Sequence, residues 1–149
     1  MALYLQERTF DQAIALLEDL LRGDPKNVEA RLLKGRIYAE MGKPQEAIGE
    51  LEQVIAERPT DAAALYFLGR LYDEQKQPDQ AIVQFEKIVS LDVDILEAYL
   101  QLGLLYAREK RFDAALTVLE KAKSKSPGKP IVFLIKRGEA THFVAVDTE

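Results

Sequence analysis

Cysteine is absent from the sequence, and histidine occurs once, at His142. Without cysteine the chain forms neither disulfides nor thiolate metal sites, and the redox compartment stays open. A single histidine with no neighbouring metal-binding partner lacks zinc-ligand spacing, and we expect it to lie on a strand surface. The sequence therefore predicts no metal site and no other cofactor.

Catalytic signatures are lacking as well. No serine lies in a Gly-x-Ser-x-Gly turn, and no glycine-rich loop has the spacing that holds a nucleotide phosphate. Asp and Glu are plentiful but scattered over predicted helix surfaces, whereas acid–base catalysis needs paired carboxylates in contrasting environments. We therefore expect that the chain is not an enzyme.

Positive charge is in deficit, with 20 Lys and Arg against 25 Asp and Glu and a formal net charge of −5. An acidic chain is a poor general ligand for nucleic acid. No apolar run approaches membrane-spanning length, so direct membrane insertion is not expected. The first eight residues lack the layout of a secretory signal. We expect a cytoplasmic protein if the chain is complete, and a periplasmic or envelope-associated one if a signal is missing.

Against these absences stands a repeat with a period of 34 residues. Gly, Tyr, Ala and Pro all follow the same step, and chance does not align four residue types in this way. The glycines are Gly35, Gly69 and Gly103, the tyrosines Tyr4, Tyr38, Tyr72 and Tyr106, the alanines Ala13, Ala47, Ala81 and Ala115, and the prolines Pro25, Pro59 and Pro127.

Each repeat predicts a helix, a turn and a second helix. In the second unit, helix A runs from about Val28 to Met41, and Gly42-Lys43 ends it. Helix B begins at Pro44, where a missing N–H has no cost, and continues to about Glu57. The recurring Gly on helix A and Ala on helix B predict two helices in close contact, because a larger side chain there would overpack.

The residues resemble the tetratricopeptide repeat (TPR) family, whose pattern is Leu-Gly-x-x-Tyr, Ala-x-x-x-Phe, Pro. Leu68-Gly69-x-x-Tyr72 with Ala81-x-x-x-Phe85 matches closely, although Lys34 and Val93 depart from the pattern. The resemblance implies an all-α fold, a right-handed superhelical solenoid of helix-turn-helix repeats, here followed by a short C-terminal β-hairpin. We expect a TPR array over 1–127, with a partial repeat 1–27 and repeats 28–61, 62–95 and 96–129, and a hairpin or tail over 130–149.

The two ends depart from the repeat. The first unit lacks the front half of helix A, and its helix B is predicted from Asp11 to about Arg22. Leu16, Leu17, Leu20 and Leu21 would then lack part of their usual cover, since no polar cap is visible. We interpret the chain as a fragment or truncated product, and the alternative is an oligomer interface at this end.

Beyond Pro127 the composition changes to β-branched and aromatic residues. The pattern predicts a hairpin of Ile131–Lys136 and Thr141–Val146 around Gly138. About twenty residues there weakly resemble the closing hairpin of PDZ modules in HtrA-type proteases. The Gly-Leu-Gly-Phe-like loop of those modules is absent, so no PDZ function is carried over.

The TPR resemblance implies that helix A lines a concave groove and that a partner is contacted from fixed repeat positions. The side chains at the fifth position of each repeat would form an apolar stripe along the groove. Alternatively, they are partly buried against the adjacent helix. Position nine offers arginines for a carboxylate or phosphate, but we favour local pairing of Arg36 with Glu40 and of Arg70 with Glu74. The candidate partner-binding residues are Leu32, Arg36, Tyr66, Arg70, Asp73, Leu100, Leu104 and Arg108.

The sequence thus predicts a protein–protein interaction scaffold that holds a peptide or helix of a partner in its groove. The lysine, arginine and asparagine clamp by which some relatives bind chaperone tails is absent, because position six carries Leu33, Phe67 and Gln101. Two alternatives stay open. The chain could self-assemble as a homo-oligomer through its first helix and its hairpin, or it could be an accessory part of a larger enzyme such as a PDZ protease.

Overall fold

A computed structural model describes residues 2–125, 131–137 and 140–146, with side chains described for 6–125. The chain divides into two compact units between Ala81 and Ile82. Helix α5 (Pro78–Ser90) begins in the first unit and ends in the second.

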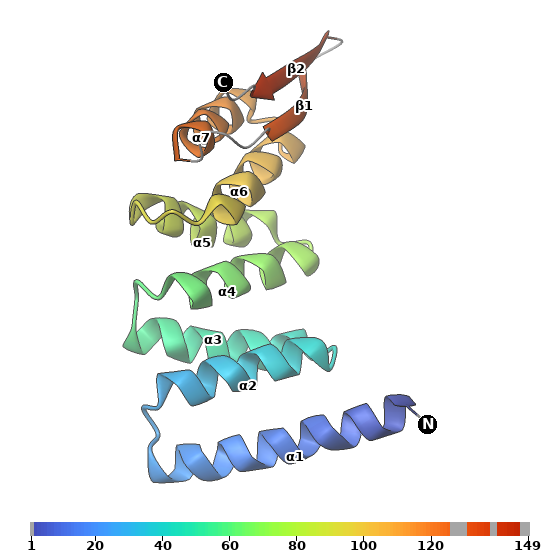
Figure 1. The fold of residues 1–149 in the computed structure, drawn as a ribbon, viewed down its shortest axis with the longest axis vertical. Helices are drawn as coiled ribbons and strands as arrows, with labels where there is room; N and C mark the ends of the chain where they lie inside the picture. Colours follow the sequence, from blue (N-terminus) through green and yellow to red (C-terminus); the bar gives the residue numbers. More distant parts are fainter. Residues whose placement is uncertain (1, 126–130, 138–139, 147–149) are drawn as a thin grey trace. The chain divides into compact units, whose positions relative to one another are not determined.

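The first unit is a series of helices in which chain neighbours pack on one another (Figure 1). Its complete helices are α1 (Ala2–Gly23), α2 (Val28–Glu40), α3 (Pro44–Glu57) and α4 (Ala62–Glu74). Helices α2 and α3 begin and end within a residue of the predicted helix A and helix B. The prediction of an all-α, TPR-type fold is therefore confirmed.

Turn chemistry recurs with the repeat. Gly42, Lys76 and Lys110, one period apart, have φ angles of 70°, 60° and 60° in the left-handed region that reverses the chain after each helix A. At the other turn, Asn27 and Asp61 accept hydrogen bonds from the backbone N–H groups of Ala30 and Ala64 and so cap α2 and α4. The sequence therefore sets the start of α2 and of α4, and the turn that follows each of them, locally.

Helix α1 corrects the prediction for the first unit. The sequence predicted a remnant of helix A followed by helix B from Asp11, but Ala2–Gly23 form one continuous helix. Arg8 holds the turn position of Lys76 and Lys110 without reversing the chain. A non-glycine residue adopts the left-handed conformation at a cost of about 1 kcal/mol. A helix that continues through Arg8 avoids that cost.

The glycines of helix A lie where two helices touch. A Cβ atom added to Gly35 of α2 would lie 3.2 Å from Leu51 Cγ and 3.3 Å from the Ala47 carbonyl oxygen, both on α3. Ala47 and Leu51 are buried, with exposures of 0% and 1%. The predicted close approach of the small residues is therefore confirmed for this pair.

The second unit contains α6 (Leu96–Arg108) and α7 (Phe112–Lys125), which pack together, and the strands β1 (Ile131–Arg137) and β2 (Ala140–Val146). The strands pair antiparallel, with Ile131 opposite Val146 and Arg137 opposite Ala140. They extend the predicted strands by one residue each, and Gly138 of the predicted turn lies outside the described residues.

A tyrosine on helix A bonds to the preceding helix B in both units. The Tyr72 hydroxyl of α4 donates a hydrogen bond to Glu52 Oε1 of α3 at 2.9 Å, and Tyr106 of α6 donates to Glu86 of α5. Glu52 and Glu86 are 34 residues apart. The repeat thus carries a polar link between successive helix pairs, which the sequence analysis missed because glutamate is common on every helix surface.

Lys34 replaces the repeat's usual leucine and forms an ionic cluster. Its ammonium lies 3.0 Å from Glu50 Oε1 of α3 and 3.2 Å from Glu18 Oε1 of α1, and Arg31 pairs with Glu50 at 3.2 Å. Burial lowers the pKa of Lys34, but the hydrogen bonds to Glu50 and Glu18 outweigh it, so the pKa is raised above its usual value. The cluster joins three helices through one mostly buried cation.

Substitution of Lys34 tests what this cluster contributes. We expect Lys34→Ala to lower the free energy of unfolding by about 1–2 kcal/mol, because Glu18 and Glu50 lose a partner. Lys34→Leu restores the residue type of Leu68 and Leu102, and replacing a buried charge with a packed hydrophobe is often neutral or stabilising. Urea denaturation measures both. A Lys34→Leu variant that is less stable than Lys34→Ala would contradict this account.

Candidate functional site

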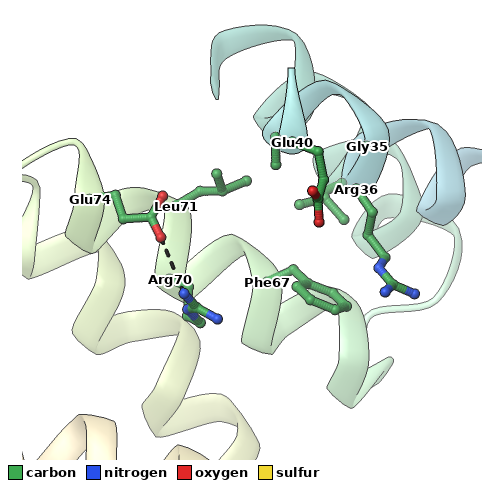
Figure 2. Close-up of a pocket in the computed structure, with 9 residues that line it drawn as sticks. Gly35, Arg36, Glu40, Phe67, Arg70, Leu71 and Glu74 are labelled. Atoms are coloured by element: carbon green, nitrogen blue, oxygen red, sulfur yellow. Dashed lines mark hydrogen bonds and ion pairs between the residues drawn. The ribbon is translucent and has the colours of Figure 1, made fainter. Parts of the chain in front are cut away.

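A hollow opens between α2 and α4 in the first unit. Its volume is about 230 Å³, and its lining includes the buried side chains of Leu51 of α3 and Leu71 of α4. Figure 2 shows Leu71 together with Arg36, Phe67 and Arg70 around the hollow. Charged side chains from both helices surround this apolar floor. The lining residues are Gly35, Arg36, Ala39, Glu40, Leu51, Phe67, Arg70, Leu71 and Glu74.

The two arginines of the hollow have different partners. Arg70 pairs with Glu74 at 3.4 Å, as the sequence predicted. Arg36 instead stacks on the ring of Phe67, with its guanidinium carbon 5.1 Å from the ring centroid. Among the side chains described for residues 6–125, no ion pair joins Arg36 to Glu40. The predicted pairing of Arg36 with Glu40 is therefore wrong, because the aromatic face on the facing helix takes the guanidinium.

Arg36 and Arg70 are the two sequence-predicted site residues that the hollow brings together. Leu32, Tyr66 and Asp73 also lie on α2 and α4 but do not line it. Leu32 and Tyr66 are half-buried, and the Tyr66 ring meets Phe67 edge-on at 6.1 Å between centroids. Tyr66 therefore supports the wall of the hollow through Phe67.

The other three predicted residues belong to the second unit. Leu100, Leu104 and Arg108 lie on α6. Leu100 is half-buried, whereas Leu104 and Arg108 are exposed, Leu104 at 46%. That these three residues of α6 contact a partner stays a prediction.

Phe67 is the main residue of the hollow that the sequence analysis did not select. It appeared there only as evidence that a chaperone-tail clamp is lacking. The signal that could have found it is the aromatic residue three positions before Arg70, on the α4 face that α2 approaches. Leu51 and Leu71 form the floor of the hollow. From the sequence pattern alone, both are predicted to be core residues.

Groups that would indicate other chemistry are missing from the described part of the chain. No cluster of three or more histidine, aspartate or glutamate residues there has metal-binding geometry. None of the described helices combines the length and the apolar character that crossing a bilayer requires.

Comparison with solved structures returns proteins of similar fold, some of which are described as tetratricopeptide repeat proteins. MamA from Desulfovibrio magneticus RS-1 is 26% identical with a TM-score of 0.68, over 78% of this chain and 66% of that one. The chain therefore spans just under two thirds of that relative. A second MamA structure is 29% identical with a TM-score of 0.52, over 80% of this chain and 90% of that one.

A third similar structure is YrrB, described as a TPR protein with an unusual peptide-binding site. It is 22% identical, has a TM-score of 0.68 and covers 84% of this chain and 64% of YrrB, a likeness that concerns the fold alone. No curated protein sequence matches the chain significantly.

The family model described as "Psidin, N-terminal TPR repeats region" matches residues 3–128. The match covers all seven described helices and ends before the hairpin, so the likeness of the hairpin to a PDZ module stays a prediction. With its 34-residue period, its recurrent left-handed turns and its glycine contacts, the chain belongs to this family of tetratricopeptide repeat proteins.

Proposed function

We propose that the chain is an interaction scaffold whose hollow between α2 and α4 binds a peptide or helix of a partner protein. The observation that carries the proposal is an open apolar floor surrounded by charged groups on two different helices. A similar fold, YrrB, is described as having a peptide-binding site, so TPR helices can carry one.

The size of the hollow favours a side chain over a small-molecule ligand. Pockets for such ligands measure about 300–1,000 Å³, whereas this one measures about 230 Å³. Leu51 and Leu71 offer a floor on which one apolar side chain of a partner can rest, and Phe67 also lines the hollow. We therefore expect the partner to anchor a Leu-sized or Phe-sized side chain there.

The rim sets the charge of that partner. Arg36 presents guanidinium N–H groups above the Phe67 ring, and Arg70 is held by an exposed i,i+4 pair with Glu74, worth about 0.3–0.5 kcal/mol. A partner carboxylate can displace Glu74 at this small cost and form a two-pronged contact with arginine. Glu40 balances the rim, so the partner is an amphipathic segment carrying both signs of charge.

Peptide selection tests the proposal. Peptides selected from a random displayed library on the wild-type chain are titrated by fluorescence anisotropy against Phe67→Ala and Arg70→Glu. We expect each substitution to raise the Kd at least tenfold, or about 1.4 kcal/mol, because one removes the wall and the other reverses the rim charge. Circular dichroism checks that both variants keep the helical fold.

Arg22→Glu is the matched control. Arg22 is also an exposed arginine in an ion pair within one helix, here with Asp19 of α1. Its reversal changes the net charge as Arg70→Glu does, and should leave the Kd unchanged. Selected peptides that bind Phe67→Ala and Arg70→Glu as tightly as wild type would reject the hollow as the binding site.

A further inference from the structure

We propose that the hollow between α2 and α4 selects a partner helix that carries an acid, an apolar residue and a base on one face, within about one turn. This inference rests on the proposed function, because it names the kind of segment that the hollow binds. Two residues of α2, Arg36 and Glu40, recognise the partner's charges, and both line the hollow. Phe67 of α4 positions Arg36 for that contact.

One sequence spacing behaves differently on the two helices of the hollow. On both α2 and α4 an arginine precedes a glutamate by four residues. On α4, Arg70 and Glu74 pair at 3.4 Å. On α2, Figure 2 shows no pair between Arg36 and Glu40, and Glu40 has no ion pair with any other side chain described for residues 6–125. The two charges of α4 are thus satisfied by each other, whereas those of α2 are left for a partner.

The ring of Phe67 accounts for this difference. The Arg36 guanidinium carbon lies 5.1 Å from the ring centroid, and stacking on a ring is worth more than an exposed ion pair between residues four apart. Tyr66 meets Phe67 edge-on and supports the ring in turn. Arg36 is therefore kept from Glu40, and α2 presents a positive and a negative residue whose Cβ atoms are about 5–6 Å apart.

The apolar part of the hollow opens beside these two charges. Ala39 lies in the same turn of α2 and presents only a methyl group, while Leu51 and Leu71 are 1% and 6% exposed. All three line the hollow together with Arg36 and Glu40. A partner therefore presents three kinds of group to one opening, namely a carboxylate for Arg36, an apolar side chain, and a cation for Glu40.

A helix meets this requirement, whereas an extended chain does not. In a helix the residues i, i+3 and i+4 share a face, so an acid, an apolar residue and a base at these positions all point into the hollow. In an extended chain only every second residue shares a face, so two charges that flank an apolar residue there are about 13 Å apart. That separation is about twice the spacing of Arg36 and Glu40. Either order of the two charges fits, because a helix can lie along α2 in either direction.

Designed peptides test the pattern. The host is an alanine-rich peptide of about 16 residues, long enough to form a helix in water, with one Glu-x-x-Leu-Lys face. In a matched peptide of the same composition, the lysine is moved two positions toward the glutamate and so leaves that face. Titration onto the full chain, followed by fluorescence anisotropy, should give a Kd for the first peptide that is lower by about fivefold or more.

A charge swap on α2 removes any difference in the helicity of the peptides. The second probe is a Glu-x-x-Leu-Glu peptide, which the wild-type chain should bind about fivefold more weakly than the Glu-x-x-Leu-Lys peptide. Glu40→Arg should reverse this preference. Glu120→Arg is the matched control, because Glu120 is an exposed glutamate of α7 outside the hollow and its reversal changes the net charge equally. It should keep the wild-type preference.

Phe67→Leu tests the positioning role of the ring. Leucine keeps the hollow apolar but frees Arg36 to pair with Glu40, so the preference between the two peptides should fall to about twofold or less. Replacing the leucine of the peptide with alanine should still weaken binding to this variant. Phe67→Tyr keeps a ring under Arg36 and should restore the full preference.

The proposed function and this inference fail in different ways. If library-selected peptides bind through the hollow while the designed peptides bind equally or not at all, the inference alone is wrong. A preference that Glu40→Arg leaves unchanged would overturn it too. So would self-association of the chain that Glu40→Arg abolishes, since the hollow would then hold a second copy. Library peptides that are indifferent to Phe67→Ala and Arg70→Glu would instead reject the hollow itself.

Discussion

Gly103→Val is expected to lower the free energy of unfolding by about 3 kcal/mol, at the upper end of the usual cost of overpacking a core. Gly103 is buried on α6, and the first added carbon would already lie 2.7 Å from Leu119 Cδ2 and 3.0 Å from its Cγ. Leu119 is 1% exposed, so other residues enclose its side chain. The two methyl groups of valine therefore force α6 and α7 apart.

Gly49→Ala is the contrasting variant. Gly49 lies in the interior of α3, and nothing stands within 4 Å of an added Cβ. Alanine is favoured over glycine in such a position by about 1 kcal/mol. Urea denaturation followed by circular dichroism should therefore show a gain for Gly49→Ala and a loss for Gly103→Val. Similar stability of the two variants would contradict the explanation that close contact between helices requires glycine at the repeat position of Gly103.

The fold was predictable because its determinants are local and repeated. The bounds and the packing of α2 and α3 could be predicted from Gly42, Pro44 and the glycine–alanine contact, because each of these acts within one helix hairpin. The α1 prediction was wrong because turn position alone does not reverse a chain. Reversal at Arg8 would need a packed helix A to offset the left-handed conformation, and packing is a tertiary property.

The candidate site was predictable only in part. Arg36 and Arg70 were selected from their repeat position, and both line the hollow. The partner of Arg36 was not predictable, because Phe67 stands on a different helix and local spacing reports only the i,i+4 neighbour Glu40. The same limit hid the bond from Tyr72 to Glu52, which joins helices of successive repeats.

Alkaline pH is expected to destabilise the chain through two tyrosines. Burial, followed by the hydrogen bonds to Glu52 and Glu86, raises the pKa of Tyr72 and of Tyr106 to about 12, from 10.0. Near pH 11 the folded chain holds these two protons while the unfolded chain has largely lost them. Stability is therefore complete below pH 10 and falls as the pH rises toward 12.

The size of the loss follows from the shift. Shifts of this size correspond to at most about 3 kcal/mol for each tyrosine, which is appreciable beside the roughly 5–15 kcal/mol typical of a folded domain. We expect the urea midpoint to decrease steeply between pH 10 and 12, together with the rise of tyrosinate absorbance. Lys34 adds to the decrease, since its raised pKa also makes stability fall as it deprotonates.

The double variant Tyr72→Phe, Tyr106→Phe isolates the tyrosine contribution. It removes both ionising groups and keeps both buried rings, which are 8% and 6% exposed. At about pH 8 it should be less stable than wild type by about 1–3 kcal/mol, because two hydrogen bonds to carboxylates are lost. Between pH 10 and 12 its midpoint should fall far less, so the difference between the two chains narrows or reverses. If the urea midpoints of the two chains fell in parallel between pH 10 and 12, the hydroxyl groups of Tyr72 and Tyr106 would not be retaining their protons in the folded chain.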